Sequence, residues 1–175
     1  MTSIIKVDQI QNAAGGTPTA ADLGLNVSGS VLQVGYGRTT AYTLHSSSSY
    51  TASNLSVTFT PKFANSKLIF DVSGSFWSST NSHTTPEYFV AQIHDSRTSS
   101  SIHPQGGHGS LWFQGTQQDG GNNWDRMVYG QTIIDNDSTA TRTYTVYVKS
   151  YYGNYGIYAF ESTADNIIRV TEIAG

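Results

Sequence analysis

The sequence predicts an all-β protein, an antiparallel two-sheet sandwich of jelly-roll type with an N-terminal extended arm. The first observation is compositional: the 175 residues include 23 Ser and 21 Thr, and Ser, Thr, Asn and Gly offer the backbone alternatives to helical hydrogen bonds. The second is that β-branched and aromatic residues gather in short runs between Gly, Asn, Asp, Ser and Pro clusters, as in strands joined by turns. The number and spacing of these runs fit a sandwich.

The chain is expected to begin with an attachment arm at residues 1–30, ahead of a β-sandwich domain at residues 31–175. The arm opens with a short apolar ridge formed by Ile4, Ile5, Val7 and Ile10. Farther along, Thr17 as N-cap and Gly24 as terminator are typical of one small helix. Because the arm has too few apolar residues for a core of its own, we expect it either to pad the end of the sandwich or to lie on another chain.

About eight strands are predicted in the domain. They are expected at residues 31–37, 55–60, 67–77, 88–94, 126–134, 142–151, 156–161 and 167–173. In several of them apolar and polar residues alternate, as in Leu55, Val57 and Phe59 with the hydroxyl residues between them, which predicts one buried face and one solvated face. Residues 67–77 are more densely apolar, which indicates a central strand covered on both faces.

The connection at residues 103–123 is longer than a hairpin requires. Connections of that length are usually functional or disordered. The apolar trio Leu111, Trp112 and Phe113 in its middle predicts a short edge strand or a contact tongue.

Composition excludes several classes of function. The net charge of -3 supplies no attraction for nucleic acid or anionic lipid, and zero Cys excludes disulfides and thiol chemistry. No run approaches 18 apolar residues, so we expect a soluble protein made in the cytoplasm, with neither a nucleic-acid partner nor a membrane partner.

No catalytic, cofactor or metal site is expected. His94, Asp95, His103 and His108 lie within fifteen positions, but no His-x-His or His-x-x-x-His spacing sets two imidazoles on one face of an element, so they are interpreted as solvated loop residues. Ser is so frequent that any Ser, His and Asp set carries no information, and no nucleophile elbow or glycine-rich phosphate loop is present.

Aromatic residues in Gly- and Asn-rich surroundings are the most informative candidates. They include Trp112, Phe113, Trp124, Tyr129, Tyr151, Tyr152, Tyr155 and Tyr158. Amphipathic rings in such surroundings anchor protein interfaces or stack on sugars. Ordinary strand packing is the third alternative.

Three stretches resemble tail-fibre-like and virion structural proteins of tailed bacteriophages, especially marine ones. They are residues 4–12 with Gly15 and Gly16, residues 29–34, and Thr60 and Pro61 with residues 66–69. The resemblance implies a non-enzymatic particle component, usually homotrimeric, with a β-sandwich body behind an N-terminal attachment segment. Its expected partners are sister copies and the major capsid protein or another virion protein, contacted through Ile4, Ile5, Val7 and Ile10.

The position on the particle is left open between two alternatives. A short chain without a repetitive shaft favours a capsid decoration (cement) protein on the head. The alternative is a short tail fibre or tail appendage that binds host surface glycan, with Trp112, Phe113, Trp124, Tyr152 and Tyr155 as the candidate interface or glycan aromatics.

Overall fold

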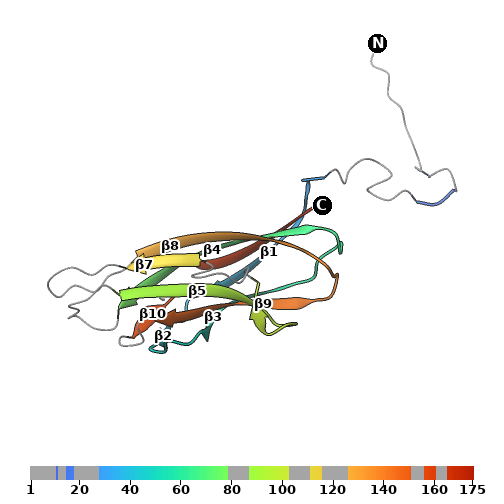
Figure 1. Ribbon diagram of the computed structural model, residues 1–175. Helices are drawn as coiled ribbons and strands as arrows, with labels where there is room; N and C mark the ends of the chain where they lie inside the picture. The colour runs from blue at the N-terminus through green and yellow to red at the C-terminus, as the bar shows by residue number, and fades with distance from the viewer. Residues whose placement is uncertain are drawn as a thin grey trace, which may run out of the picture.

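Strands make up nearly all of the regular structure in the computed structural model (Figure 1), which describes residues 11, 15–17, 28–78, 87–102, 111–115, 126–150, 156–160 and 165–175. For residues 77–78, 87–89, 111–115 and 126–128 it describes the backbone alone. The strands within these ranges are β1 (Val31–Thr39), β2 (Thr43–His45), β3 (Thr51–Phe59), β4 (Lys67–Ser78), β5 (Glu87–Asp95), β6 (Ser100–Ser101), β7 (Leu111–Gly115), β8 (Arg126–Asp135), β9 (Arg142–Ser150), β10 (Ile157–Ala159) and β11 (Asn166–Ile173). These ranges contain no helix.

The strands form two sheets in which every pairing is antiparallel. Sheet A runs β8-β4-β11-β1, with the short β10 and β2 continuing beside the far end of β4. Sheet B runs β3-β9-β5-β7, with β6 pairing the end of β5. If β2, β6 and β10 are left out and the remaining eight strands are renumbered 1 to 8 along the chain, sheet A has the order 1-8-3-6 and sheet B has the order 2-7-4-5. This order is that of a jelly roll, which confirms the predicted fold class.

The predicted strands agree with eight of the observed ones. Strand β3 begins four residues earlier than expected, because Thr51 and Ala52 pair with β9 ahead of a register shift. Ser53 bridges that irregularity, since its hydroxyl donates to the Val146 carbonyl at 2.7 Å and accepts from Leu55 N at 3.2 Å. The predicted edge strand around residues 111–113 is confirmed as β7, which pairs with β5.

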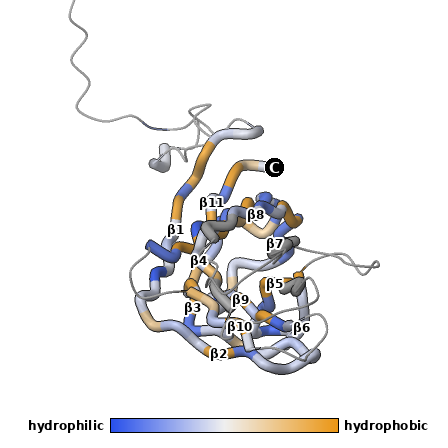
Figure 2. The backbone as a smooth tube through the Cα atoms, turned by 90° about the vertical axis from the view of Figure 1, so that its left-hand side faces the viewer, coloured by the Kyte–Doolittle hydropathy of each residue, from blue (hydrophilic) through white to orange (hydrophobic). Residues whose placement is uncertain are grey.

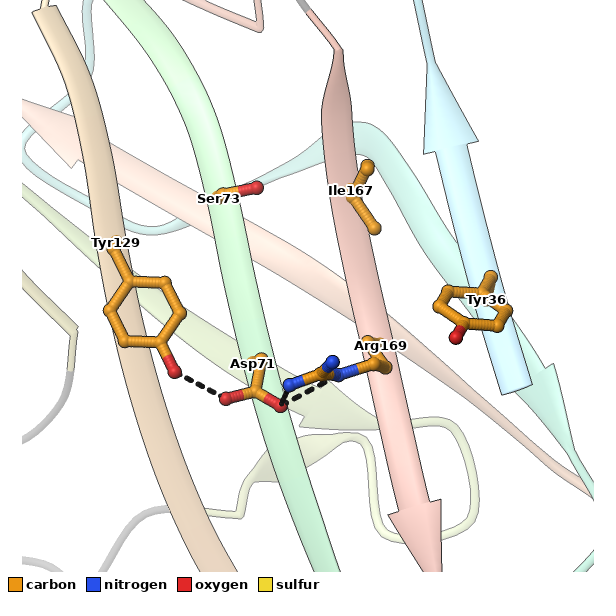
Figure 3. A pocket seen from close by; sticks show the side chains of 6 residues that line it. All are labelled: Tyr36, Asp71, Ser73, Tyr129, Ile167 and Arg169. Carbon is orange, nitrogen blue, oxygen red and sulfur yellow. Dashed lines mark hydrogen bonds and ion pairs between the residues drawn. The ribbon is translucent and has the colours of Figure 1, made fainter. Parts of the chain in front are cut away.

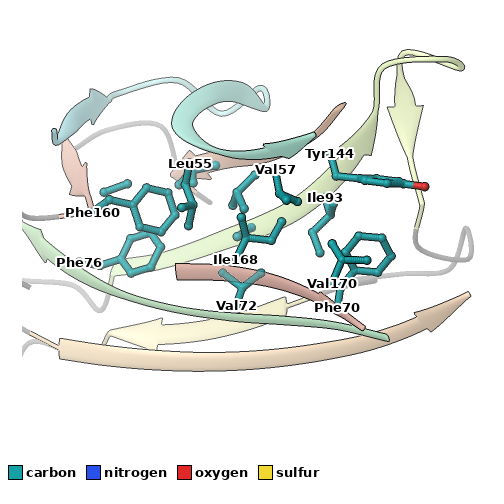
Figure 4. Packing of buried hydrophobic residues seen from close by; sticks show 14 of the residues in the cluster. Leu55, Val57, Phe70, Val72, Phe76, Ile93, Tyr144, Phe160, Ile168 and Val170 are labelled. Atoms are coloured by element: carbon teal, nitrogen blue, oxygen red, sulfur yellow. The ribbon is translucent and has the colours of Figure 1, made fainter. Parts of the chain in front are cut away.

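The core lies between the two sheets (Figure 4). At one end the rings of Phe76 and Phe160 pack with centroids 5.2 Å apart, and at the other Phe70 meets Tyr144 edge-on at 4.7 Å. Alternation selects these residues: along β9 every second side chain is buried, beginning with Arg142 and ending with Ser150. Strand β1 lacks this regular alternation, and in Figure 2 it carries hydrophobic and hydrophilic stretches.

The sheets approach closely where β1 passes β3. A Cβ on Gly37 would lie 1.8 Å from the backbone oxygen of Ser56, so only glycine fits this contact. Strand β4 is central, as predicted, because β11 and β8 flank it on either side. Its outward residues Asp71 and Ser75 are also buried.

Candidate interaction surfaces

The outer face of sheet A carries several exposed apolar side chains. Strand register aligns three rows of outward residues across β8, β4, β11 and β1. In that order the rows are Ile133, Ile69, Thr171 and Val34; Gln131, Asp71, Arg169 and Tyr36; and Tyr129, Ser73, Ile167 and Arg38. We call this surface the sheet A face, and include Val31, which pairs with Ile173 beyond the first row.

Exposed apolar side chains are concentrated on this face. Eight large hydrophobic side chains are exposed in the described ranges, and five of them lie here. They are Val31, Val34, Tyr36, Tyr129 and Ile133, with exposed fractions between 41% and 62%. They lie on β1 and β8, the two strands that flank β4 and β11, and several exposed apolar side chains on one face make that face a candidate interaction site.

Two charged groups at the centre of the sheet A face, Asp71 and Arg169, are paired with each other (Figure 3). Asp71 accepts hydrogen bonds from the Tyr129 hydroxyl at 2.5 Å and Gln131 Nε2 at 2.7 Å on one oxygen, and from Arg169 Nε at 2.9 Å and Nη2 at 2.6 Å on the other. Burial alone would raise the pKa of Asp71, but the hydrogen bonds and the Arg169 charge lower it overall. The carboxylate is therefore ionised at neutral pH and fully occupied.

A hollow of about 230 Å³ lies over this network, between the rings of Tyr36 and Tyr129 (Figure 3). Ser73 and Ile167 complete its lining beside Asp71 and Arg169. No side chain in it has the free, perturbed carboxyl or imidazole that acid–base chemistry requires. Oriented tyrosines and an ion-paired arginine are instead the residues that anchor protein interfaces.

The outer face of sheet B is different, because it combines aromatic rings with hydroxyl groups. Tyr147 of β9 and His94 of β5 stack with centroids 3.9 Å apart and planes 11° apart, and Tyr50 lies beside His94 at 6.4 Å. The interpretation of His94 as a solvated loop residue was wrong: the ring projects from a strand and is half-buried by its neighbours. In the described part of the chain, no group of three metal-ligating side chains forms.

Most of the site residues predicted from sequence lie beyond what the structure describes. Ile4, Ile5, Val7 and Ile10, the predicted helix after Thr17, Trp124, Tyr152 and Tyr155 are outside the described residues. The backbones of Trp112 and Phe113 lie on β7, opposite Val90 and Phe89 of β5. The roles assigned to these residues stay predictions.

Among the candidate aromatics whose side chains the structure describes, Tyr129 is exposed on the sheet A face, and Tyr158 of β10 packs edge-on against Tyr42 with ring centroids 5.3 Å apart. Asp71, Arg169 and Tyr36 were missed, because a single chain gives no signal for the register that joins residues as far apart as 71 and 169. The nearest available signal was the presence of a carboxylate and a guanidinium in otherwise apolar strands.

The comparisons with known proteins add little. A scan against models of protein families finds no match, and neither does a search of curated proteins. Among solved structures, the chain is similar to the CBM22-1 xylan-binding domain of Xyn10C from Paenibacillus barcinonensis, with a TM-score of 0.28 and 10% identity over 85% of this chain and 97% of that one. At that similarity the sandwich assignment rests on the strand pairing itself. The described residues include no helix that could span a membrane.

Proposed function

We propose that the protein is a non-enzymatic structural component of a bacteriophage particle, a homotrimeric capsid decoration protein that stabilises the head. The observation that carries the proposal is the concentration of exposed apolar side chains on the sheet A face. The reason for proposing a bacteriophage particle is the resemblance of residues 4–12 and the two later stretches to virion proteins. In this role the protein is made in the host bacterial cytoplasm and resides in the virion.

The chemistry of the sheet A face suits burial against another protein. Burying an unpaired charge is strongly unfavourable, but Asp71 and Arg169 already neutralise each other at 2.6 Å. These two charges can therefore be covered without losing their partners, whereas Arg38 in the third row is exposed and would need a partner on the other protein. In a closed ring of three, each copy presents one surface to the next copy and a second to the previous one, and the sheet A face supplies one of these two surfaces.

The arm is proposed to attach the protein to the particle. Ile4, Ile5, Val7 and Ile10 would dock on the major capsid protein or another virion protein, beyond the described residues. Deleting residues 1–12 should leave the sandwich folded and reduce incorporation into particles. Undiminished incorporation of the shortened chain would remove the arm from the proposal while leaving the ring intact.

Light scattering during size-exclusion chromatography tests the trimer. The wild-type protein at micromolar concentration should have three times the 18.9 kDa mass of one chain. Ile133→Glu with Val34→Glu should reduce it to one chain, because both residues are exposed on the sheet A face. Phe63→Glu is the matched control, since Phe63 is an exposed apolar residue outside that face. A wild-type monomer, or a trimer unaffected by the double substitution, would contradict the proposed interface.

Imaging of intact particles carrying a tagged chain separates head from tail. Copies distributed over the head are expected for a decoration protein. A second candidate, a short tail fibre or tail appendage that binds host surface glycan, is favoured by the hydroxyl-lined hollow on the outer face of sheet B. Copies confined to the tail would favour that candidate.

A further inference from the structure

The outer face of sheet B contains a second hollow, where β5 turns into β6. Its volume is about 270 Å³, just below the range of about 300–1,000 Å³ for pockets that hold drug-sized ligands. It is lined by His94, Asp95, Ser96, Ser99, Thr143, Thr145 and Tyr147. A space of this size suits a single small ring rather than a long segment of chain.

One wall of the hollow is aromatic. The rings of His94 and Tyr147 are stacked on each other, so packing fixes their orientation. Tyr50 supports them from the side, and Lys149 Nζ lies 4.7 Å from the centroid of the Tyr50 ring. Burial lowers the pKa of His94, which leaves the imidazole neutral at pH 7 and the wall uncharged. Because each ring covers one face of the other, the stack offers a ligand its outer ring face, and an uncharged aromatic face favours the C–H face of a sugar ring over a charged group.

The other walls present hydroxyl groups. The Ser96 hydroxyl accepts from Thr143 N at 3.0 Å, and the Thr143 hydroxyl pairs with that of Thr58 at 3.0 Å. In the described part of the chain no hydrogen bond involves the Thr145 or Ser99 hydroxyl. A hydroxyl both donates and accepts, so these two groups match a ligand whose own polar groups do the same.

The charges around the hollow disfavour an anion. Asp95 is the ionisable acid in the lining, and its carboxylate is held by Arg142 Nη1 at 3.4 Å and by the backbone N of Arg97 at 2.8 Å. Neither arginine lines the hollow, and its described lining includes no lysine. A phosphate or carboxylate ligand would find no free cation in the lining, because Arg142 is paired with Asp95 and Arg97 is paired with Asp137.

We propose that this hollow binds one neutral pyranose unit of a glycan, with its C–H face against the His94 and Tyr147 wall and its hydroxyl groups on Thr145 and Ser99. The inference deepens the second candidate function, and it is independent of the trimer and of the sheet A face. It also moves the glycan site away from Trp112, Phe113 and Trp124, where the sequence placed it. The leading structural role stands whichever way the sugar experiment goes.

Saturation-transfer NMR on the full chain tests the site. The probes are methyl β-D-glucopyranoside, methyl β-D-galactopyranoside and methyl α-D-mannopyranoside, titrated to about 50 mM because single sugar units bind with affinities near the millimolar range. At least one probe should bind saturably. Glucose 6-phosphate is the anionic comparator and should bind more weakly than the best neutral probe.

Variants assign the binding to the hollow. Tyr147→Ala and Thr145→Val should each weaken it at least about tenfold, a loss of about 1.4 kcal/mol. Thr145→Val removes only a hydroxyl from a half-buried position, so it keeps the test valid if Tyr147→Ala does not fold. Tyr129→Ala on the sheet A face should leave binding unchanged. Absence of saturable binding by all three sugars, tighter binding of glucose 6-phosphate, or unchanged binding by both hollow variants would overturn the proposal.

Discussion

Glu172 is a buried carboxylate whose replacement by glutamine should destabilise the sandwich. It lies at the end of β11, faces inward and is 0% exposed. Its oxygens accept hydrogen bonds from Lys62 N at 2.9 and 3.0 Å, Phe63 N at 3.0 Å, the Ser66 hydroxyl at 2.7 Å and Gln33 Nε2 at 2.6 Å. One side chain thus holds the connection between β3 and β4 against β1 and β11.

The expected loss follows from counting these donors. Glutamine keeps one acceptor oxygen but replaces the other with an NH₂ group. That NH₂ group then faces an N–H or O–H donor whose hydrogen bond the second oxygen had accepted. A hydrogen bond to a charged group contributes about 1.5–3 kcal/mol, and a buried donor left unpaired costs about 1–3 kcal/mol. Because Gln33 Nε2 also donates to the Thr60 carbonyl at 2.8 Å, it retains a partner. We therefore expect a loss of about 3 kcal/mol, or about 6–12 °C in Tm.

The effect of Glu172→Gln should depend on pH with a defined sign. Burial alone would raise the pKa of Glu172, but the donors from Lys62, Ser66, Phe63 and Gln33 lower it below 4.5 overall. The stabilisation from the ionised form is therefore complete above about pH 4.5 and is lost as the pH falls through the lowered value. The difference between wild type and variant should shrink in acid.

Urea denaturation followed by tryptophan fluorescence measures this loss, at one protein concentration for both chains because assembly stabilises the folded state. Asp135→Asn is the matched control: Asp135 pairs with Lys67 at 2.6 Å, but its side chain is 88% exposed, so the loss should stay below about 1 kcal/mol. A Glu172→Gln protein as stable as Asp135→Asn would refute the argument that this carboxylate holds the connection.

Three further predictions concern other parts of the molecule. Burial lowers the pKa of His45, so the folded state resists protonation there, and the free energy of unfolding should fall as the pH drops below about 6.5 toward the lowered value; a decline no smaller in His45→Asn would contradict this. Gly37→Ala places a Cβ 1.8 Å from Ser56 O and should cost about 3 kcal/mol or more in urea denaturation, whereas wild-type stability would show that β1 can move away. Tyr129→Phe removes one of several donors to Asp71 from an exposed side chain, so the trimer should be retained in light scattering; dissociation would mean that the hydroxyl itself makes the contact.

Much of the fold was predictable because it depends on local patterns. The alternation around Leu55, Val57 and Phe59 gave the buried face of β3, and the dense apolar run after Lys67 gave the central strand. Strands β2 and β6 were not predicted, because three and two residues are too few to show a period. Phe160 shortened β10 relative to the prediction, since its φ of 67° turns the chain out of the strand.

The interaction surfaces were less predictable because they depend on register. Nothing local to Asp71 indicates that Arg169 will lie opposite it, and His94 reads as a polar residue near a turn until β9 brings Tyr147 against it. Glu172 illustrates the same point, since four partners from residues 33–66 converge on it only when β11 pairs with β1 and β4. Pairing across long separations is what a single sequence does not specify.

The segments where the chain enters and leaves the sandwich, at Gly29 and Ala174, lie side by side, and this matters for where a label can be attached. Gly29 N donates to the Ala174 carbonyl at 2.8 Å, and Ala174 N donates to the Ser30 carbonyl at 2.9 Å. A fluorescent protein fused after Gly175 would therefore crowd the pole at which Gly29 and Ser30 enter the sandwich, and its bulk would interfere with the proposed attachment. A dye on an engineered cysteine away from that pole, in a chain that has no cysteine of its own, would report position while leaving the pole clear.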